Sequence, residues 1–132
     1  MSTESRSTVR VRYAETDQMG VAYHGNYFAW FEVGRTDLLR NLGVTYRDLE
    51  KDGLRLPVIE VRARFLRPAL YDDVLDIHTR VTSLGGASIG FEYEVRKGGA
   101  DAPLATGSTA HAAVDGDGRP RRLPEDIRRR LV

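Results

Sequence analysis

Residues 13–43, YAETDQMGVAYHGNYFAWFEVGRTDLLRNLG, decide the fold of this chain. The stretch begins as the end of a strand, passes through a polar turn with two acids, and becomes the one long helix. Asp17 and His24 bracket Gly20 in that turn, just upstream of the helix. Backbone N–H groups at a helix start are unpaired and carry partial positive charge. We expect an acid beside such donors to act on a carbonyl group whose oxygen the donors hold.

From Asn26 onward the sequence has the period of a helix. Large apolar side chains cover most of the circumference of its first half, which is typical of a buried helix (Tyr27, Phe28, Trp30, Phe31, Val33, Leu38, Leu39 and Leu42). Gly34 lowers the helix propensity, so we expect another element to pack closely against it. Gly43 stands where a glycine C-cap is expected, and Thr45–Gly53 predicts a short second helix.

Strand patterns flank the long helix. Residues 9–13 alternate apolar and basic side chains, which predicts a half-buried strand, whereas residues 1–7 are polar and are expected to be frayed. Four strand-like runs follow the helix and are joined by tight turns, which favour an antiparallel meander: 59–65, 74–83, 89–95 and 104–114. The last run has many small residues, which favours close approach of another backbone or helix.

This order of elements predicts the fold class α+β. A five-stranded antiparallel sheet has one face to cover, and the long helix is the only element long enough to cover it. The predicted architecture is therefore a sheet curled around one helix. Asp115–Gly118 is expected to be a turn, and Pro124–Leu131 a short C-terminal helix.

The composition limits the classes of function. The 132 residues fit one domain, 1–132, and 41% hydrophobic with 30% charged residues is ordinary for a soluble protein. The absence of cysteine excludes disulfides and thiolate chemistry, and a net charge of +1 argues against general nucleic-acid binding. No apolar run resembles a signal peptide or a membrane span, so we expect a cytoplasmic protein. The three histidines are scattered, so no metal site is predicted.

The residues of the turn have two interpretations. Glu15 and Asp17 are either solvated or capping acids, or groups that react from a loop, where reactive side chains are often carried. His24 is either a histidine with a satisfied structural hydrogen bond or a general acid/base. The residues alone leave both interpretations open.

The same residues carry a family resemblance. The run Tyr13-x-Glu15-Thr16-Asp17-x-x-Gly20-Val21-x-Tyr23-His24-x-Asn26-Tyr27, with Arg35 in the helix, closely resembles the 4-hydroxybenzoyl-CoA thioesterase/YbgC-like family of hotdog-fold acyl-CoA thioesterases. Two later runs fit the family too, Arg67-Pro68-Ala69-x-Tyr71-Asp72-Asp73 and Ala105-x-Gly107, so the resemblance covers about residues 8–115. It implies the hotdog fold, in which an antiparallel sheet wraps a long helix.

The resemblance also implies roles for residues of the motif. The family's catalytic acid falls on Asp17, and the backbone N–H that polarises the thioester carbonyl falls on His24. Other motif positions are expected to bind substrate: Gly20, Tyr23, Asn26 and Tyr27. A histidine at position 24 resembles the YbgC branch rather than the 4-hydroxybenzoyl-specific branch. The implied substrate is a small-molecule acyl-CoA, with no further cofactor, and the implied assembly is a homodimer or homotetramer with the active site at the dimer interface.

Coenzyme A carries phosphates that need positive charge near the site. The candidates are Arg62, Arg64 and Arg67, with Arg96-Lys97 at a later strand end, because arginine suits phosphate oxygens. For each one, a solvated outer-face charge is the alternative. Two other functions compete with hydrolysis: a hotdog protein that binds an acyl thioester without cleaving it, and a hotdog dehydratase, which would need its own acid–base pair in the helix region.

Overall fold

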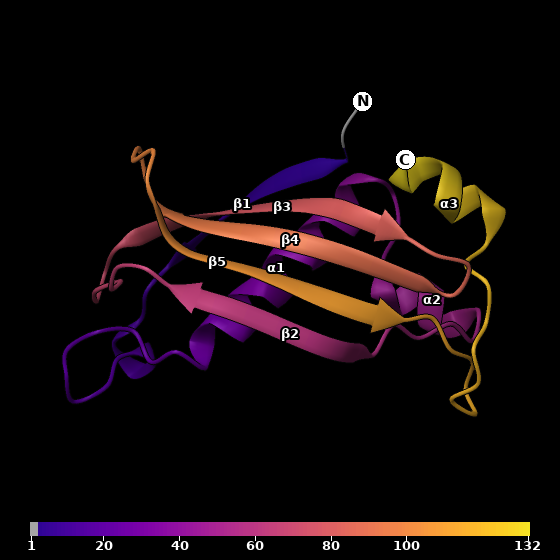
Figure 1. Ribbon diagram of the computed structural model, residues 1–132, viewed down its shortest axis with the longest axis horizontal. Helices are drawn as coiled ribbons and strands as arrows, with labels where there is room; N and C mark the ends of the chain where they lie inside the picture. The colour runs from indigo at the N-terminus through magenta and orange to yellow at the C-terminus, as the bar shows by residue number, and fades with distance from the viewer. Residues whose placement is uncertain (1–2) are drawn as a thin grey trace.

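A computed structural model describes residues 3–132 as one antiparallel sheet with a long helix packed on one side (Figure 1). Its elements in chain order are β1 (Glu4–Arg10), the 3₁₀ turn η1 (Tyr13–Glu15), α1 (Asn26–Asn41), α2 (Tyr46–Lys51), β2 (Val58–Phe65), β3 (Val74–Leu84), β4 (Ser88–Lys97), β5 (Pro103–Ala112) and α3 (Glu125–Leu131). The α+β class and the hotdog arrangement expected from the sequence are confirmed.

The long helix α1 ends where the sequence predicts. Gly43 has a φ of +81°, a value that glycine adopts at little cost, and the N–H of Val44 returns to the carbonyl of Leu39 at 2.8 Å. The prediction that α1 is buried on nearly all sides, however, is wrong for a single chain. Phe28 and Val33 are 43% and 37% exposed, because the sheet covers only one face of the helix.

The sheet has the strand order β1-β3-β4-β5-β2, and every neighbouring pair is antiparallel. The predicted meander is therefore correct for β3, β4 and β5 but wrong for β2, which pairs with β5 and not with β3. The connection between β2 and β3, residues 66–73, is too long for a tight hairpin turn. Its first two N–H groups, those of Leu66 and Arg67, both donate to the carbonyl of Leu104, which extends the pairing with β5.

The first strand starts earlier than predicted. Residues 4–7 were expected to be frayed, but they pair with β3, from Glu4 opposite Arg80 to Ser7 opposite Ile77. Their polar, serine-rich sequence gives little local strand signal, so the pairing is decided by the exposed edge of β3. Residues 1–2 of the segment expected to be frayed lie outside the described residues.

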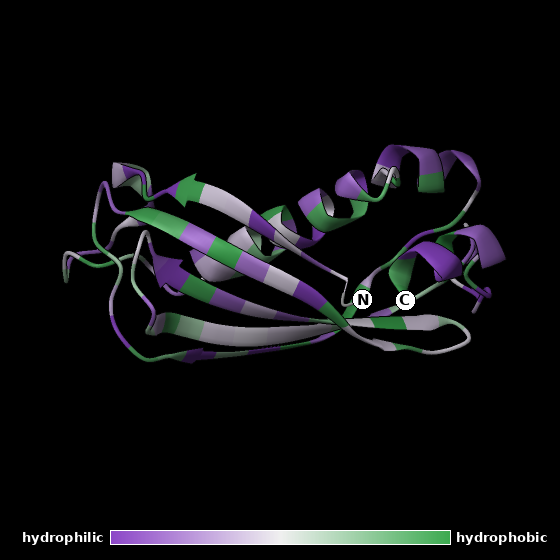
Figure 2. Cartoon of the chain, turned by 90° about the horizontal axis from the view of Figure 1, so that it is seen from above, coloured by the Kyte–Doolittle hydropathy of each residue, from purple (hydrophilic) through white to green (hydrophobic). Residues whose placement is uncertain are grey.

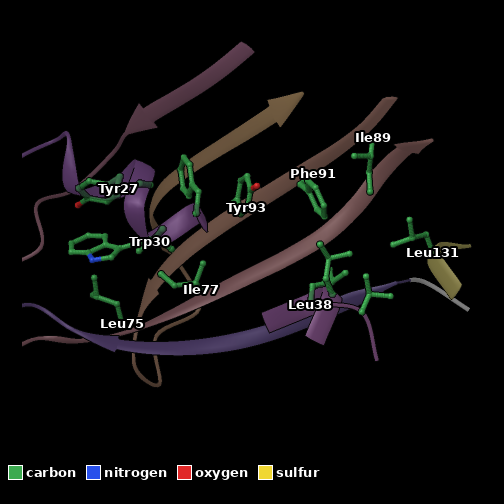
Figure 3. Close-up of a cluster of buried hydrophobic side chains, with 14 of the residues drawn as sticks. Tyr27, Trp30, Leu38, Leu75, Ile77, Ile89, Phe91, Tyr93 and Leu131 are labelled. Carbon is green, nitrogen blue, oxygen red and sulfur yellow. The ribbon is translucent and has the colours of Figure 1, made fainter. Parts of the chain in front are cut away.

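Close packing of α1 on the sheet explains the glycine in the helix and the small residues of the last strand. A Cβ added at Gly34 would overlap the side chain of Thr79, and one added at Gly107 would overlap the ring of Phe31. Phe31 stacks on Tyr93 with ring centroids 4.4 Å apart. Figure 3 shows the resulting core, in which aromatic and aliphatic side chains are interleaved, with Leu75 near Trp30 and Ile89 near Phe91.

Hydropathy alternates along the strands, as expected for a sheet with one face on the core (Figure 2). Gly107 and its β2 partner Ala63 face α1, so Arg62 and Arg64 lie on the outer face. The predicted short helix, the 115–118 turn and the C-terminal helix are all present. No helix within residues 3–132 is long and apolar enough to cross a bilayer.

Candidate active site

The loop between η1 and α1, residues 16–25, is closed by its own backbone. The N–H of Tyr23 donates to the carbonyl of Glu15 at 2.8 Å, and the N–H of Asp17 donates to the carbonyl of Val21 at 2.9 Å. Between these two bonds, Thr16 and Ala22 form an isolated bridge. Asp17 and Tyr23 are thereby held on the two facing arms of this η1–α1 loop, and His24 follows directly.

Asp17 lies at the bend of this loop with one carboxylate oxygen engaged. Its Oδ1 accepts the N–H of Met19 at 2.9 Å, and its carbonyl accepts the N–H of Gly20 at 2.9 Å. Within the described residues, Oδ2 accepts no hydrogen bond. The carboxylate is half-buried, so one oxygen is fixed by the turn while the other remains available.

Gly20 serves the turn that holds Asp17. Its φ of +80° lies in the left-handed region, which an L side chain adopts only with strain, and the position of a Cβ there is open. The structure therefore gives Gly20 a backbone role, and its predicted contact with substrate stays a prediction.

The start of α1 offers two backbone donors. Asn26 donates its N–H to Tyr23 at 3.0 Å and Tyr27 donates to His24 at 3.2 Å, whereas the N–H groups of His24 and Gly25 donate to no carbonyl within residues 3–132. Such donors at a helix start favour an anion or a polarised carbonyl oxygen. The N–H of His24 is therefore available, and its predicted bond to a thioester carbonyl stays a prediction.

The side chain of His24 lies at the surface between two aromatic rings. Its ring centroid is 4.3 Å from that of Tyr23 and 6.1 Å from that of Phe65, at the end of β2. Tyr23 is 50% exposed and lies over Gly25, where an added Cβ would meet its ring at 2.8 Å. The Tyr23 ring therefore lies beside the backbone of Gly25, one of the two residues with a free N–H group.

Two of the predicted substrate-binding residues are occupied within the chain. The amide of Asn26 donates to the carbonyl of Glu15 at 2.7 Å, so it fastens the loop to the helix. Tyr27 is only 3% exposed, and burial raises the pKa of its phenol against the opposing effect of the Ala69 backbone. Within a single chain, Asn26 and Tyr27 therefore stabilise the structure on which the site is built.

Sequence reasoning missed the importance of Glu15. Its side chain is buried, its Oε2 accepts the indole N–H of Trp30 at 3.2 Å, and its Oε1 accepts the N–H of Arg12 at 2.8 Å. A signal was present in the sequence, because a tryptophan on a buried helix face needs an acceptor for its N–H. The nearest acids upstream of Trp30 are Glu15 and Asp17.

The three arginines predicted to bind coenzyme A do not form one cluster. Arg62 and Arg64 are exposed on the outer face of β2, and Arg62 lies 3.3 Å from Glu60. Arg67 is exposed beyond the end of β2, two residues before Ala69, whose carbonyl accepts the N–H of Ala22 at 2.8 Å. Arg67 therefore lies on the segment that is hydrogen-bonded to the η1–α1 loop through Ala69, whereas Arg64 adjoins Phe65, whose ring lies near His24.

The later pair of basic candidates is engaged with acids. Arg96 lies 2.8 Å from Glu94, and Lys97 lies 3.4 Å from Asp73. Both pairs are partly exposed, so they remain accessible to solvent but are already compensated in charge.

His111 lies fully buried in the core. Its Nδ1 is 3.0 Å from the carbonyl of Leu56, and its Nε2 is 2.8 Å from the hydroxyl of Thr109, which lies 2.6 Å from the Tyr93 hydroxyl. Burial is the main cause that lowers the pKa of His111; the Leu56 carbonyl raises it and the charge of Arg35 lowers it further. This histidine is a neutral structural group. Within residues 3–132, no three acidic or histidine side chains are grouped to hold a metal ion.

Two hollows lie away from the η1–α1 loop. One of about 690 Å³ lies on the outer sheet face and includes Arg62 and Arg64, and one of about 720 Å³ lies beside α1 and α2 and includes Arg35 and Tyr46. Neither hollow is lined by Asp17 or His24. In a single chain the loop lies at the surface, where Met19 is 81% and Tyr23 50% exposed.

Comparison with known proteins shows to which family this chain belongs. The thioesterase superfamily model matches residues 19–103, starting two residues after Asp17. The chain is 37% identical to the putative acyl-CoA thioesterase YneP of Bacillus subtilis over 84% of this chain and 80% of that protein. It is 35% identical to the acyl-CoA thioester hydrolase YbgC of Escherichia coli over 71% and 70% of the two chains. A crystal structure of a hypothetical protein, TT1821 from Thermus thermophilus, aligns with a TM-score of 0.90 at 39% identity, covering 96% of each chain. The chain belongs to the thioesterase superfamily.

Proposed function

We propose that this protein is an acyl-CoA thioesterase that hydrolyses a thioester to a free acid and coenzyme A. The observation that carries the proposal is the loop itself, in which a carboxylate with one free oxygen and two free N–H groups at a helix start lie on adjoining segments. The names of the relatives YneP and YbgC support the same substrate class.

The carbonyl oxygen of the thioester accepts hydrogen bonds from the N–H groups of His24 and Gly25. These donors and the helix dipole stabilise the negative charge that develops on this oxygen when the carbonyl carbon is attacked. Loss of one such donor typically costs about 10²–10³ in kcat. The backbone supplies this effect, so side-chain substitution at position 24 leaves most of it in place.

Asp17 acts through its free Oδ2 by one of two routes. As a general base it takes a proton from water, whose oxygen attacks the carbonyl carbon while the carbon–sulfur bond breaks. As a nucleophile it forms an acyl anhydride and releases the thiolate, and water then cleaves the anhydride. The leaving thiolate needs little protonation, since cysteine-type thiols have a pKa of about 8.5. His24 positions the substrate or the water, or assists the proton transfer to sulfur.

The phosphates of coenzyme A bind at the arginines near the end of β2. Arg67 lies two residues before Ala69, whose carbonyl accepts the N–H of Ala22 in the loop, and its guanidinium suits phosphate oxygens. Arg62 and Arg64 lie on the outer face of the same strand and would join the site only through a neighbouring chain or a nucleotide that wraps the strand end.

We also propose that the protein is a cytoplasmic homo-oligomer in which β2 pairs with its copy. This strand is the free edge of the sheet beyond β5, and its apolar side chains are exposed: Val58 46%, Ile59 65%, Val61 38% and Phe65 48%. An open apolar edge invites a second strand, and a two-fold axis would pair β2 antiparallel with its copy. Phe65 contacts Tyr27 with ring centroids 5.0 Å apart, so such an interface adjoins the η1–α1 loop.

The test is a screen for thiol release from short-chain, long-chain and aromatic acyl-CoAs, with a thiol-reactive dye as the readout. The chain has no cysteine, so the dye reports only coenzyme A. We expect at least one substrate class to be turned over catalytically. Tight acyl-CoA binding by calorimetry without thiol release from any substrate would instead establish the non-catalytic binding protein.

A further inference from the structure

Glu15 is hydrogen-bonded to three segments that shape the candidate site. Its carbonyl accepts the N–H of Tyr23 at 2.8 Å and the side-chain amide of Asn26 at 2.7 Å. Its carboxylate accepts the N–H of Arg12 at 2.8 Å and the indole N–H of Trp30 at 3.2 Å. One residue thereby joins the exit of β1, the second arm of the loop and the first two turns of α1.

The carboxylate of Glu15 has little freedom to do anything else. The residue is only 8% exposed and Trp30 only 3%, so the indole N–H of Trp30 depends on this carboxylate rather than on water. The guanidinium Nε of Arg12 lies 3.4 Å from Oε1 and offsets the buried charge. Both oxygens already accept hydrogen bonds within the chain, so we assign this carboxylate a positioning role and no part in the chemistry.

What these bonds fix is the direction of the free N–H groups. The helix start has no side-chain cap of its own, since Gly25 occupies the N-cap position. Its orientation relative to Asp17 is therefore set by the bonds of Asn26 and Trp30 to Glu15. The loop that carries Asp17 begins directly after Glu15, and its second arm is hydrogen-bonded to Glu15 through the N–H of Tyr23. Glu15 therefore contacts both the loop with Asp17 and the helix start with the free N–H groups.

We infer that Glu15 is a positioning residue for thioester hydrolysis. It fixes the position of the Asp17 carboxylate relative to the N–H groups of His24 and Gly25. This inference rests on the proposed hydrolase function. A displacement of about 1 Å at a reacting group costs on the order of a hundredfold in rate. Weakening the hydrogen bonds of Glu15 should therefore lower kcat. The nucleotide of the substrate binds elsewhere, so KM changes little.

The variant that tests this inference is Glu15→Gln. The carboxylate has two acceptor oxygens for two N–H donors, whereas glutamine has one acceptor oxygen and an NH₂ group. The amide therefore has to point its NH₂ at either Arg12 or Trp30, where two donors then oppose each other. We expect kcat to fall about ten- to hundredfold while KM stays within about threefold of the wild-type value.

A double-variant cycle with Trp30→Phe separates positioning from general destabilisation. Trp30→Phe removes the indole donor and should itself lower kcat about threefold or more. In that background the NH₂ group introduced by Glu15→Gln no longer meets a donor, so this second substitution should lower kcat by about threefold or less. The matched control is Glu92→Gln, which removes an exposed acid paired with Arg80 at 2.6 Å and should leave both constants unchanged.

The readouts are kcat and KM for the best acyl-CoA of the screen, with a thermal melt of each variant. A Glu15→Gln protein with kcat within threefold of wild type would overturn the inference, as would additive losses in the cycle or a rise in KM at constant kcat. If Glu15→Gln does not fold, Trp30→Phe alone decides, and a wild-type kcat in that variant overturns the inference. Absence of hydrolysis by the wild-type protein would instead overturn the proposed function, and this inference with it.

Discussion

Substituting alanine for Gly107 tests the packing of α1 on the sheet. The added Cβ would lie 2.4 and 2.5 Å from two atoms of the Phe31 ring and 2.8 Å from the backbone carbonyl oxygen of Arg62. Phe31 is fully buried and stacked on Tyr93 with an interplanar angle of 10°, so its ring cannot turn aside without losing that contact. The neighbouring strand β2 cannot move away without breaking its ladder with β5.

The expected cost follows from these distances. Forcing a methyl group into a packed core typically destabilises by about 1–3 kcal/mol, and the loss of glycine entropy in the unfolded chain returns only about 0.4–1 kcal/mol. For a chain of this size, 1 kcal/mol corresponds to about 3–6 °C in Tm. Because the added Cβ meets a locked ring and a backbone oxygen, the cost lies in the upper half of that range, about 2–3 kcal/mol, which leaves a net loss of about 1–2.6 kcal/mol. We therefore expect Gly107→Ala to lower Tm by about 3–15 °C.

The assay is thermal and urea unfolding at one fixed protein concentration, because association would shift the apparent stability. The control is Gly116→Ala, where a Cβ meets nothing within 4 Å and no positive φ is required. A Gly107→Ala protein as stable as the wild type, or destabilised no more than Gly116→Ala, would refute the close approach of α1 to β5.

The remaining predictions concern pH, assembly, the coenzyme and metals. The pKa of His111 in the folded protein lies below its ordinary 6.5, so the unfolded chain takes up a proton at a higher pH than the folded protein does. The contribution of His111 to the free energy of unfolding should therefore be complete above about pH 6.5 and decrease below it. In His111→Gln, stability should depend less on pH over the same range. An identical pH slope in both proteins would contradict this. Sedimentation at micromolar concentration should show a species larger than 14.8 kDa, and a purely monomeric protein would remove the proposed β2 interface. Arg67→Glu should raise KM for acyl-CoA at nearly constant kcat and change little for an acyl-pantetheine, with Arg62→Glu and Arg64→Glu as parallel variants; equal losses on both substrates, or none, would make these arginines surface charges only. Dialysis against a chelator should leave hydrolysis unchanged, and activity restored by one divalent ion would show a metal requirement.

Local signals predicted the elements well, but pairing between distant elements could not be read from them. Helix periodicity and Gly43 located α1 and its end, and the small residues of the last strand, Gly107 among them, predicted the close helix contact. The position of β2 beside β5 depends on contacts about forty residues away in sequence, which no turn residue encodes. For the same reason the polar residues 4–7 looked frayed, although β3 recruits them as a strand.

The sequence motif singled out candidate residues of the site, but it did not show which contacts hold those residues in place. The motif identified Asp17 and the backbone of His24, and the structure places both on one closed loop at the helix start. Glu15 was interpreted only as an approach or reacting acid, because its bond to Trp30 spans fifteen residues and forms only when the helix packs. Asn26 likewise matched a motif position without showing that its amide is used within the chain.

The central claim is that the carboxylate of Asp17 drives thioester cleavage, and Asp17→Asn tests it most directly. The substitution keeps the Oδ1 acceptor for Met19 and the size of the side chain, and it removes the base or nucleophile. Measured as coenzyme A release under saturating acyl-CoA, kcat should fall by at least about a hundredfold while the melt and acyl-CoA binding stay close to those of the wild type. A folded Asp17→Asn protein with near-normal kcat would contradict the claim.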